Sequence, residues 1–201
     1  MKYIAVLDYE HLDNGLFLTS VAKAFAEQQN RQTQLVVVHG ESEYTERLIQ
    51  TGIMREEATV RAIKDLNHRL IALFADQGVS AVGLNGYQRE CITLKDDTLD
   101  MDLDYFNRLH QGPVLVLSNL VLDEETARPV PVPLPRYLAF LHAQFSPNEV
   151  FLFSKYDHIS PAAEGVPSDP QKEPPEELAQ LSFPTKLTTA EEFRNHIADN
   201  N

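Results

Sequence analysis

The sequence predicts an α/β protein in which a mostly parallel central sheet is sandwiched between helices. Short runs of consecutive apolar residues, rich in valine and leucine, alternate along the chain with longer segments of helical periodicity. Because these runs do not alternate apolar with polar residues, both faces of the predicted sheet are expected to be covered. Strands separated by helices favour parallel pairing, since each helix carries the chain back to the starting edge of the sheet.

The first part of the chain contains three predicted strands and three predicted helices. The strands are residues 3–7, 35–39 and 79–84. The helices are residues 15–29, 42–51 and 56–77. Ser42 is the predicted N-cap of the second helix, and Gly52 and Gly78 are the predicted stops of the second and third helices.

The later part continues the pattern with less regular connections. Residues 89–94 are predicted to form a hairpin arm, 102–110 and 137–145 helices, and 113–117 and 150–153 buried strands. The proline-rich residues 128–135 are expected to be an extended connection, because proline does not fit the interior of a helix.

The composition changes near residue 157, which sets the predicted domain boundaries. Residues 1–157 are predicted to form one α/β domain, and residues 158–186 a proline-rich loop or linker. Residues 187–201 are predicted to form a C-terminal helix. Thr188 with Glu191, or Thr189 with Glu192, could supply its capping box.

Charge and cysteine content exclude several classes of function. The formal net charge of −13 excludes a nucleic-acid backbone or an anionic membrane as an expected partner. The single cysteine, Cys91, permits neither an internal disulfide nor a cluster of zinc thiolates. The acidic residues 96–104 lack the glycine turn and closing glutamate of a calcium loop, so no metal site is predicted. Without a membrane-length apolar run or a signal-peptide pattern, we expect a cytoplasmic location.

One segment, His39-Gly40-Glu41-Ser42, follows a buried strand and precedes a helix. A strand that runs through a glycine turn into a helix commonly offers main-chain N–H groups to an anion. Here, however, the residue after the glycine is Glu41, whose negative charge would repel a phosphate. The segment therefore has the pattern of a phosphate-binding turn with an opposing charge inside it.

Four segments together resemble the motifs of the amino acid kinase family, which includes the acetylglutamate, aspartate, carbamate and uridylate kinases. In chain order they are His39-Gly40-Glu41-Ser42, Gly52-Ile53-Met54-Arg55, Leu66-Asn67 and Ala81-Val82-Gly83-Leu84-Asn85-Gly86. The resemblance covers roughly residues 35–94 in order and spacing. It implies an acetylglutamate kinase-like fold with a truncated nucleotide-side half. It also implies phosphoryl transfer from ATP and a homodimer formed through the long helix at residues 56–77.

The charged groups that this resemblance would require are mostly missing. The family's first strand carries a lysine followed by glycines, whereas residues 5–10 contain no lysine and two carboxylates. The family's Asn-Ala-Asp is replaced by Pro133-Leu134-Pro135-Arg136, and its Thr-Asp by Ser154-Lys155. Phosphoryl transfer depends on positive charge around the phosphates, so these differences argue against catalysis.

The candidate ligand-binding residues carry alternative structural interpretations. The set is His39, Gly40, Glu41, Arg55, Asn85 and Gly86. His39 could be a packing or capping histidine. Arg55 could grip a ligand carboxylate, as arginine does in a bidentate contact, or pair with the neighbouring Glu56 or Glu57. Asn85 could simply be the residue before a glycine turn.

Three functional hypotheses follow, and the third is a simple structural or assembly protein. The first is a degenerate amino acid kinase-like protein, a pseudokinase without cofactor, that binds a small anionic or carboxylate ligand or regulates a partner. The alternative is a divergent kinase that phosphorylates a small carboxylate, such as an acetylated amino acid, with ATP and Mg²⁺. In that case Lys155 and Lys186 are the candidate catalytic residues, replacing the lost phosphate-binding lysines.

Overall fold

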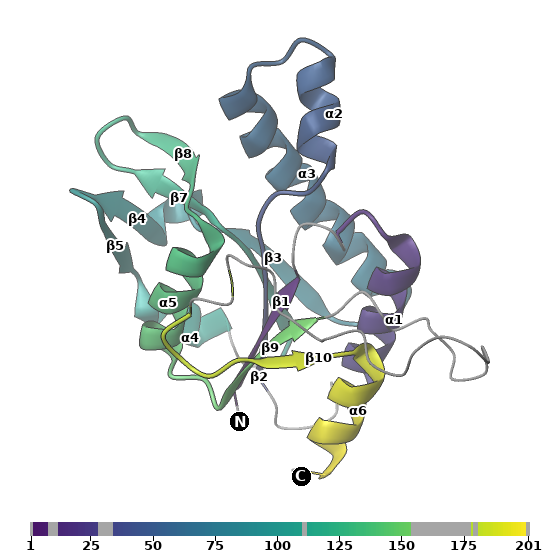
Figure 1. Cartoon of the computed structure of the whole chain (residues 1–201). Coiled ribbons are helices and arrows are strands. Elements are labelled where there is room, and N and C mark those ends of the chain that lie inside the picture. The colour runs from purple at the N-terminus through teal and green to yellow at the C-terminus, as the bar shows by residue number, and fades with distance from the viewer. Residues whose placement is uncertain are drawn as a thin grey trace.

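The computed structural model describes residues 2–7, 12–27, 34–109, 112–153, 178 and 181–199 of the chain. Its main element is a six-stranded sheet in which every described pair of neighbours is parallel. In spatial order the strands are β10 (Lys186–Thr188), β9 (Glu149–Phe153), β1 (Lys2–Leu7), β2 (Gln34–His39), β6 (Val114–Ser118) and β3 (Ala81–Asn85). The predicted parallel sheet is confirmed (Figure 1).

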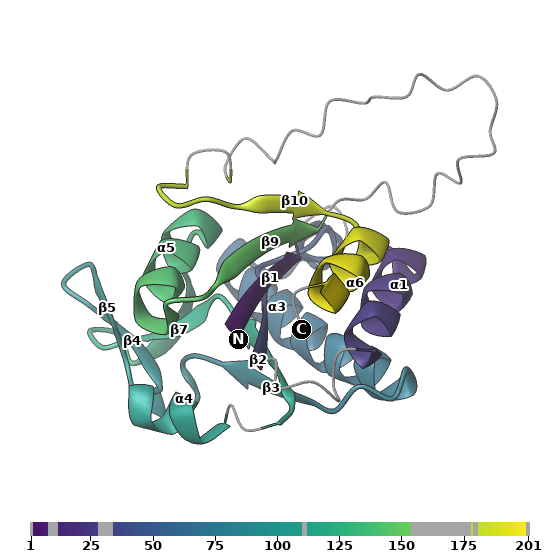
Figure 2. The same cartoon turned by 90° about the horizontal axis from the view of Figure 1, so that it is seen from below.

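Helices cover both faces of this sheet, as Figure 2 shows from below. One face is covered by α1 (Gly15–Ala26), α3 (Arg55–Asp76) and α6 (Ala190–Asp199). The other is covered by α4 (Leu103–Leu109) and α5 (Leu134–Phe145). Side chains alternate along each strand, so β1 sends Tyr3, Ala5 and Leu7 into the first core and Ile4 and Val6 into the second. This arrangement explains why the strands are apolar throughout.

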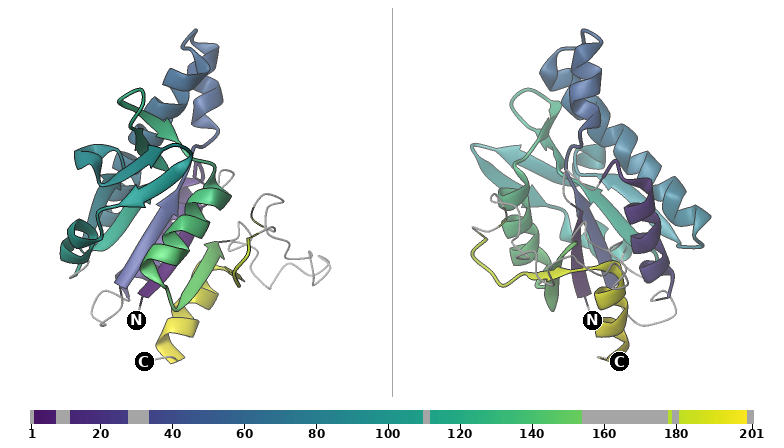
Figure 3. Two further views of the ribbon diagram at one scale, coloured as in Figure 1. Left: turned by 90° about the vertical axis from the view of Figure 1, so that its left-hand side faces the viewer. Right: turned by 45° about the vertical axis from the view of Figure 1, so that its right-hand side comes forward.

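A second, four-stranded sheet lies beside the first. Its spatial order is β5 (Thr98–Met101), β4 (Ile92–Lys95), β7 (Leu120–Asp123) and β8 (Arg128–Pro131). Two residues with positive φ, Asp96 and Asp97, form the turn of the β4–β5 hairpin. At the far end of the molecule, α2 (Tyr44–Gln50) and the start of α3 project as a pair of helices (Figure 3).

Several element boundaries differ from those predicted. The helix expected to begin after Ser42 begins at Tyr44; Glu43 is its N-cap, and the Ser42 hydroxyl accepts a hydrogen bond from the Tyr44 N–H at 3.3 Å. The segment 128–135, expected to be a simple connection, contains β8 and the start of α5. Proline fits both places, because β8 is an edge strand and Pro135 lies in the first turn of its helix.

The end of the chain also differs in detail. Leu187, expected at the start of the last helix, lies in β10, which pairs in parallel with β9. The helix α6 begins at Ala190 and is capped as the second of the two alternatives predicts. The Thr189 N–H donates to Glu192 Oε2 at 3.2 Å, and the Glu192 N–H donates to Thr189 Oγ1 at 3.1 Å. Lys155 and most of the predicted linker lie outside the described residues.

Candidate functional site

The carboxyl edge of the six-stranded sheet is a row of buried polar side chains. His39 ends β2, Ser118 ends β6 and Asn85 ends β3, and the strand register aligns all three. None of the three is more than 3% exposed. Ligands of open parallel sheets bind outside this edge, so the row is the candidate site.

His39 is held neutral in this row. Its Nδ1 lies 3.0 Å from the Gly40 carbonyl oxygen, and its Nε2 lies 3.0 Å from Asn67 Nδ2. Since the carbonyl only accepts and the amide nitrogen only donates, Nδ1 carries the proton and Nε2 accepts. Complete burial lowers the pKa of His39 to about 4, although its hydrogen bond to Gly40 acts in the opposite direction. Both ring nitrogens are therefore occupied, and the ring carries no positive charge at neutral pH.

Asn67 connects the helix α3 to the sheet beneath it. Its Nδ2 donates to His39 and also to the Val116 carbonyl oxygen at 3.2 Å. A Cβ atom at Gly83 would lie 2.4 Å from Asn67 Oδ1 and 2.9 Å from Ile71 Cγ1. The glycine in the Ala81–Asn85 segment is therefore required by the close packing of this asparagine.

Ser118 and Asn85 extend the same hydrogen-bonded row. The Ser118 hydroxyl donates to Asn85 Oδ1 at 2.7 Å, and the Asn85 N–H donates to Gln88 Oε1 at 3.1 Å. Asn85 thus bonds both to the neighbouring strand and to the turn that follows it.

Gly86 also has a packing role. A Cβ atom there would lie 2.7 Å from the Leu120 carbonyl oxygen. Its own carbonyl accepts bonds from the Ile92 N–H at 2.8 Å and from Cys91 Sγ at 3.1 Å. Burial raises the pKa of the Cys91 thiol to about 11, so this cysteine is a buried, unreactive group.

Gly40 lies against Asn119, the residue that follows β6. Gly40 does not have a positive φ, and a Cβ atom there would lie 3.4 Å from Asn119 Nδ2. Asn119 Nδ2 donates to the Val132 carbonyl oxygen at 2.8 Å and so fixes the segment before α5. Ser118 and Asn119 were not among the predicted residues, although a Ser-Asn pair directly after a buried strand is a signal that could have identified them.

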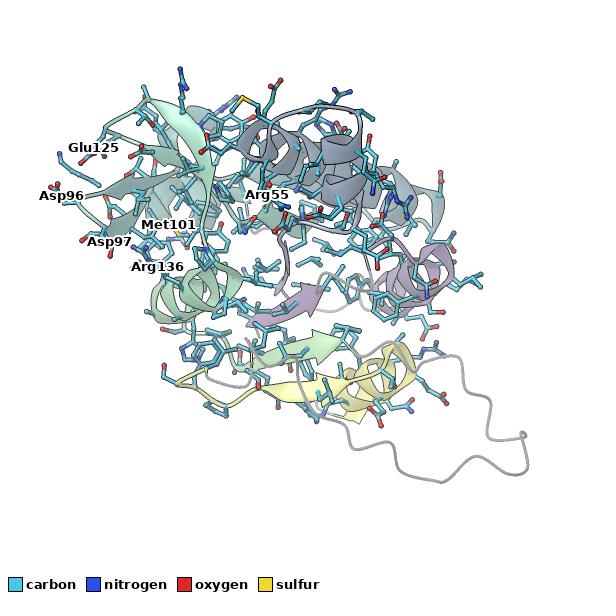
Figure 4. The ribbon with its side chains drawn as sticks, turned by 45° about the horizontal axis from the view of Figure 1, so that its top comes forward. Arg55, Asp96, Asp97, Met101, Glu125 and Arg136 are labelled. Carbon is cyan, nitrogen blue, oxygen red and sulfur yellow. The ribbon has the colours of Figure 1, made fainter. Side chains whose placement is uncertain are left out.

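The two predicted cationic residues that the structure describes lie away from this row. Arg55 is 65% exposed at the start of α3, and its Nη1 lies 3.0 Å from Glu46 Oε1 of α2, a different partner from Glu56 or Glu57 (Figure 4). Lys186 is exposed in β10, level with Val37 of β2, and β9 and β1 lie between them. Its Nζ lies 2.7 Å from His196 Nδ1 of α6.

Two further arginines, Arg136 and Arg69, are also paired with carboxylates. Figure 4 shows Arg136 of α5 beside the β4–β5 turn, where its Nη1 lies 2.7 Å from Asp97 Oδ1. Arg69 of α3 binds Asp13, with Nη1 3.1 Å from Oδ1, and also donates to the Leu12 carbonyl. Within the described ranges, no three His, Cys, Asp or Glu side chains are grouped so that they could hold a metal ion. No helix in the described part of the chain is long and apolar enough to span a membrane.

The six-stranded parallel sheet and its covering helices form an α/β fold whose carboxyl edge carries the row of buried polar side chains. No protein-family model matches the sequence, and neither does any curated protein. Solved structures do match. The chain is similar to an isopentenyl phosphate kinase, with a TM-score of 0.58 and 15% identity over 77% of this chain and 72% of that one.

Two larger proteins are also similar to this chain. An aspartate kinase from Synechocystis has a TM-score of 0.62 and 13% identity, over 76% of this chain and 28% of that one. An N-acetylglutamate synthase from Neisseria gonorrhoeae, complexed with coenzyme A and N-acetyl-glutamate, has a TM-score of 0.57 and 16% identity, over 79% and 42% of the two chains. The predicted amino acid kinase-like fold is thereby confirmed.

Proposed function

We propose that this chain is a small-ligand-binding or regulatory module built on the amino acid kinase fold, and that it does not transfer phosphoryl groups. The observation that carries the proposal is the state of His39 and Asn67. The imidazole is neutral and its two nitrogens are bonded, while the Asn67 amide nitrogen is bonded to His39 and to the main chain. Groups engaged in this way hold the sheet and helix together, and they are not available to a transferred phosphate.

The charge around the site supports the same conclusion. Stabilising a transferred phosphoryl group requires cations at the site. Arg55 is paired with Glu46, Lys186 is bonded to His196, and Glu41 adds a negative charge to the turn after β2. The sequence contains no lysine or arginine between Tyr3 and Ala22, where the family carries its first phosphate lysine.

The proposed ligand is a small carboxylate that binds at Arg55, outside the row of buried polar side chains. The Arg55 side chain is 65% exposed, and a carboxylate could replace Glu46 as its partner. Three of the similar structures carry amino acids or their derivatives, namely N-acetyl-glutamate, L-arginine and aspartate. The homodimer through α3 and the cytoplasmic location stay predictions.

The alternative is a divergent kinase that uses ATP and Mg²⁺ with Lys155 and Lys186. It would require Lys186 to leave His196 and reach the carboxyl edge across β9 and β1.

The test is thermal unfolding of the full chain with millimolar Mg-ATP and, separately, with a panel of free and N-acetylated amino acids. We expect Mg-ATP to leave the midpoint unchanged. A binding carboxylate at about a hundred times its Kd should add about 2.7 kcal/mol and raise the midpoint by several degrees. Arg55→Gln should abolish that shift, whereas Arg61→Gln, a similarly exposed arginine of α3, should keep it.

Either of two results would contradict the proposal. One is a Mg-ATP-dependent shift accompanied by formation of a phosphorylated acceptor that Lys186→Ala abolishes. The other is a carboxylate shift that both arginine variants retain.

A further inference from the structure

A lysine, a histidine and a glutamate meet at the β10 end of the large sheet, away from the carboxyl edge. Lys186 Nζ lies 2.7 Å from His196 Nδ1, and His196 Nε2 lies 2.8 Å from Glu149 Oε2. The three residues come from β10, α6 and β9, elements that lie side by side in Figure 2. The fold therefore assembles this cluster from residues that are far apart in the sequence.

Strand register and helix packing explain why these side chains meet. Lys186 is aligned with Phe151 in the parallel pairing of β10 with β9, so both side chains point to the same face of the sheet. Glu149 lies two residues before Phe151 on the same strand and shares that face. The helix α6 packs there through Phe193, whose ring centroid is 5.0 Å from that of Phe151, and His196 follows three residues later on the same side of the helix.

The contact with the lysine assigns the proton of the His196 ring. An ammonium group only donates hydrogen bonds, so Nδ1 must accept from Lys186, and the single proton of the neutral imidazole is on Nε2. The Phe151 ring meets the imidazole edge to face, with the two centroids 5.4 Å apart, and restricts its orientation. His196 thus directs a lone pair at the lysine nitrogen.

We propose that Lys186 is a modification site, at which its amine takes a small acyl group from an activated donor without a separate transferase. The unprotonated fraction of the amine attacks the acyl carbonyl carbon and forms a new N–C bond. The attacking nitrogen gives one proton to His196 Nδ1. The bond from the carbonyl carbon to the leaving phosphate or thiolate breaks, and its electron pair leaves with that group. The product is an Nζ-acyl lysine, the imidazolium returns its proton to water, and nothing is oxidised or reduced.

The surroundings favour this step at Lys186 over a lysine that has only a carboxylate partner. The His196 side chain is 21% exposed and is held by its packing, while Lys186 is open to a donor in solution. When the imidazole takes the proton it becomes positive, and the Glu149 carboxylate 2.8 Å away stabilises that charge. This stabilisation is by charge, because Glu149 Oε2 has no aligned hydrogen bond in the described part of the chain.

The experiment incubates the full chain with acetyl phosphate and, separately, with acetyl-coenzyme A, and follows each lysine by quantitative peptide mass spectrometry. Lys95 is the internal control, since it is exposed and its Nζ lies 3.3 Å from Glu124 Oε2, a carboxylate in place of an imidazole. We expect Lys186 to be acetylated about tenfold faster than Lys95, because a positioned base contributes at least that factor. The two donors show whether acyl phosphates, thioesters or both are the source.

Two variants assign the roles of the neighbours. His196→Gln should lower the Lys186 rate to that of Lys95, whereas His68→Gln, at an exposed histidine of α3, should leave it unchanged. Glu149→Gln should lower the Lys186 rate by a smaller factor. Salt at about 1 M should slow Lys186 acetylation in the native chain and hardly affect Glu149→Gln, because salt screens a charge contact and does not disturb packing.

Three results would overturn the proposal. They are equal acetylation of Lys186 and Lys95 with both donors, a Lys186 rate that His196→Gln leaves unchanged, and nitrogen NMR spectra in which His196 carries its proton on Nδ1. The last measurement uses the native chain, so it decides the question even if a variant does not fold. None of these readouts requires nucleotide or a carboxylate ligand, so this proposal and the proposed function fail separately.

Discussion

Two regions on the same face of the sheet differ in the burial and in the charge of their polar side chains. At the carboxyl edge, His39, Asn67 and Ser118 are almost completely buried and are bonded to one another or to the main chain. At the C-terminal unit of β10 and α6, Lys186 is exposed, and its partner His196 has Nε2 2.8 Å from Glu149 Oε2. The polar groups of the first region are neutral, whereas those of the second include the charged side chains of Lys186 and Glu149.

This difference supports the proposal that the chain does not transfer phosphoryl groups. A phosphoryl-transfer enzyme needs positive charge at the carboxyl edge, where the phosphates would bind, and does not depend on charge elsewhere. Here a buried neutral network lies at the edge, and Lys186, which the family resemblance suggested for catalysis, is bonded within the C-terminal unit. The four predictions below test how far the two regions differ, from the largest expected effect to the smallest.

Asn67→Leu should lower the free energy of unfolding by about 3 kcal/mol, because it removes two hydrogen bonds and leaves His39 Nε2 buried without a donor. Urea unfolding measures the change. Asn107→Leu, the same substitution at an exposed position of α4, is the control and should be nearly neutral. A loss of less than about 1 kcal/mol for Asn67→Leu would show that the network is not a structural element.

Acid should weaken the carboxyl-edge region through His39. The pKa of His39 is lowered from 6.5 to about 4 in the folded state. Between these two pH values the imidazole is protonated in the unfolded chain and mostly neutral in the folded chain. Stability contributed by the neutral ring is therefore complete above about pH 6.5 and is lost as the pH falls toward about 4. At about pH 4.5 the loss amounts to about 2.5 kcal/mol.

The measurement compares urea unfolding at about pH 7 and about pH 4.5 for the native chain and for His39→Gln. On going to the lower pH, the free energy of unfolding should fall by about 2.5 kcal/mol more in the native chain than in the variant. His68→Gln, an exposed histidine of α3, should behave like the native chain. Equal acid sensitivity in the native chain and His39→Gln would mean that the ring is not buried and neutral.

Thr189→Ala should cost about 1 kcal/mol, because it removes one of the two reciprocal bonds of the capping box that begins α6. Thermal unfolding followed by circular dichroism is the measurement. Glu191→Ala, next to the box and exposed, should have a smaller effect. If the two variants unfold at the same midpoint temperature, the capping box does not stabilise the helix.

Lys186→Met should change the free energy of unfolding by less than about 0.5 kcal/mol, since contacts of exposed charged groups contribute little and methionine keeps the aliphatic stem. Urea unfolding at neutral pH measures it. A loss comparable to that of Asn67→Leu would remove the contrast between the two regions.

The sequence predicted the sheet and most helices because each strand is a short apolar run and each long helix has a continuous apolar stripe. His39 and Asn85 were predicted as ligand-binding residues through their resemblance to the family motifs, and the structure places both at the carboxyl ends of strands. The sequence did not predict the bonds of His39, since Asn67 is 28 positions away and meets it only through the packing of α3 on the sheet. Nor did it predict β8, because pairing of a proline-containing segment depends on β7 lying beside it.

The contact between Gly83 and Asn67 also limits which substitutions residue 83 can accept. A side chain at residue 83 collides with both Asn67 and Ile71, so it would fit only if both of those side chains also changed. Packing alone therefore requires the glycine of the Ala-Val-Gly-Leu-Asn segment, whether or not a nucleotide binds. A kinase-like motif at this place in the chain is thus a constraint of close packing between helix and sheet, and it is not by itself a sign of catalysis.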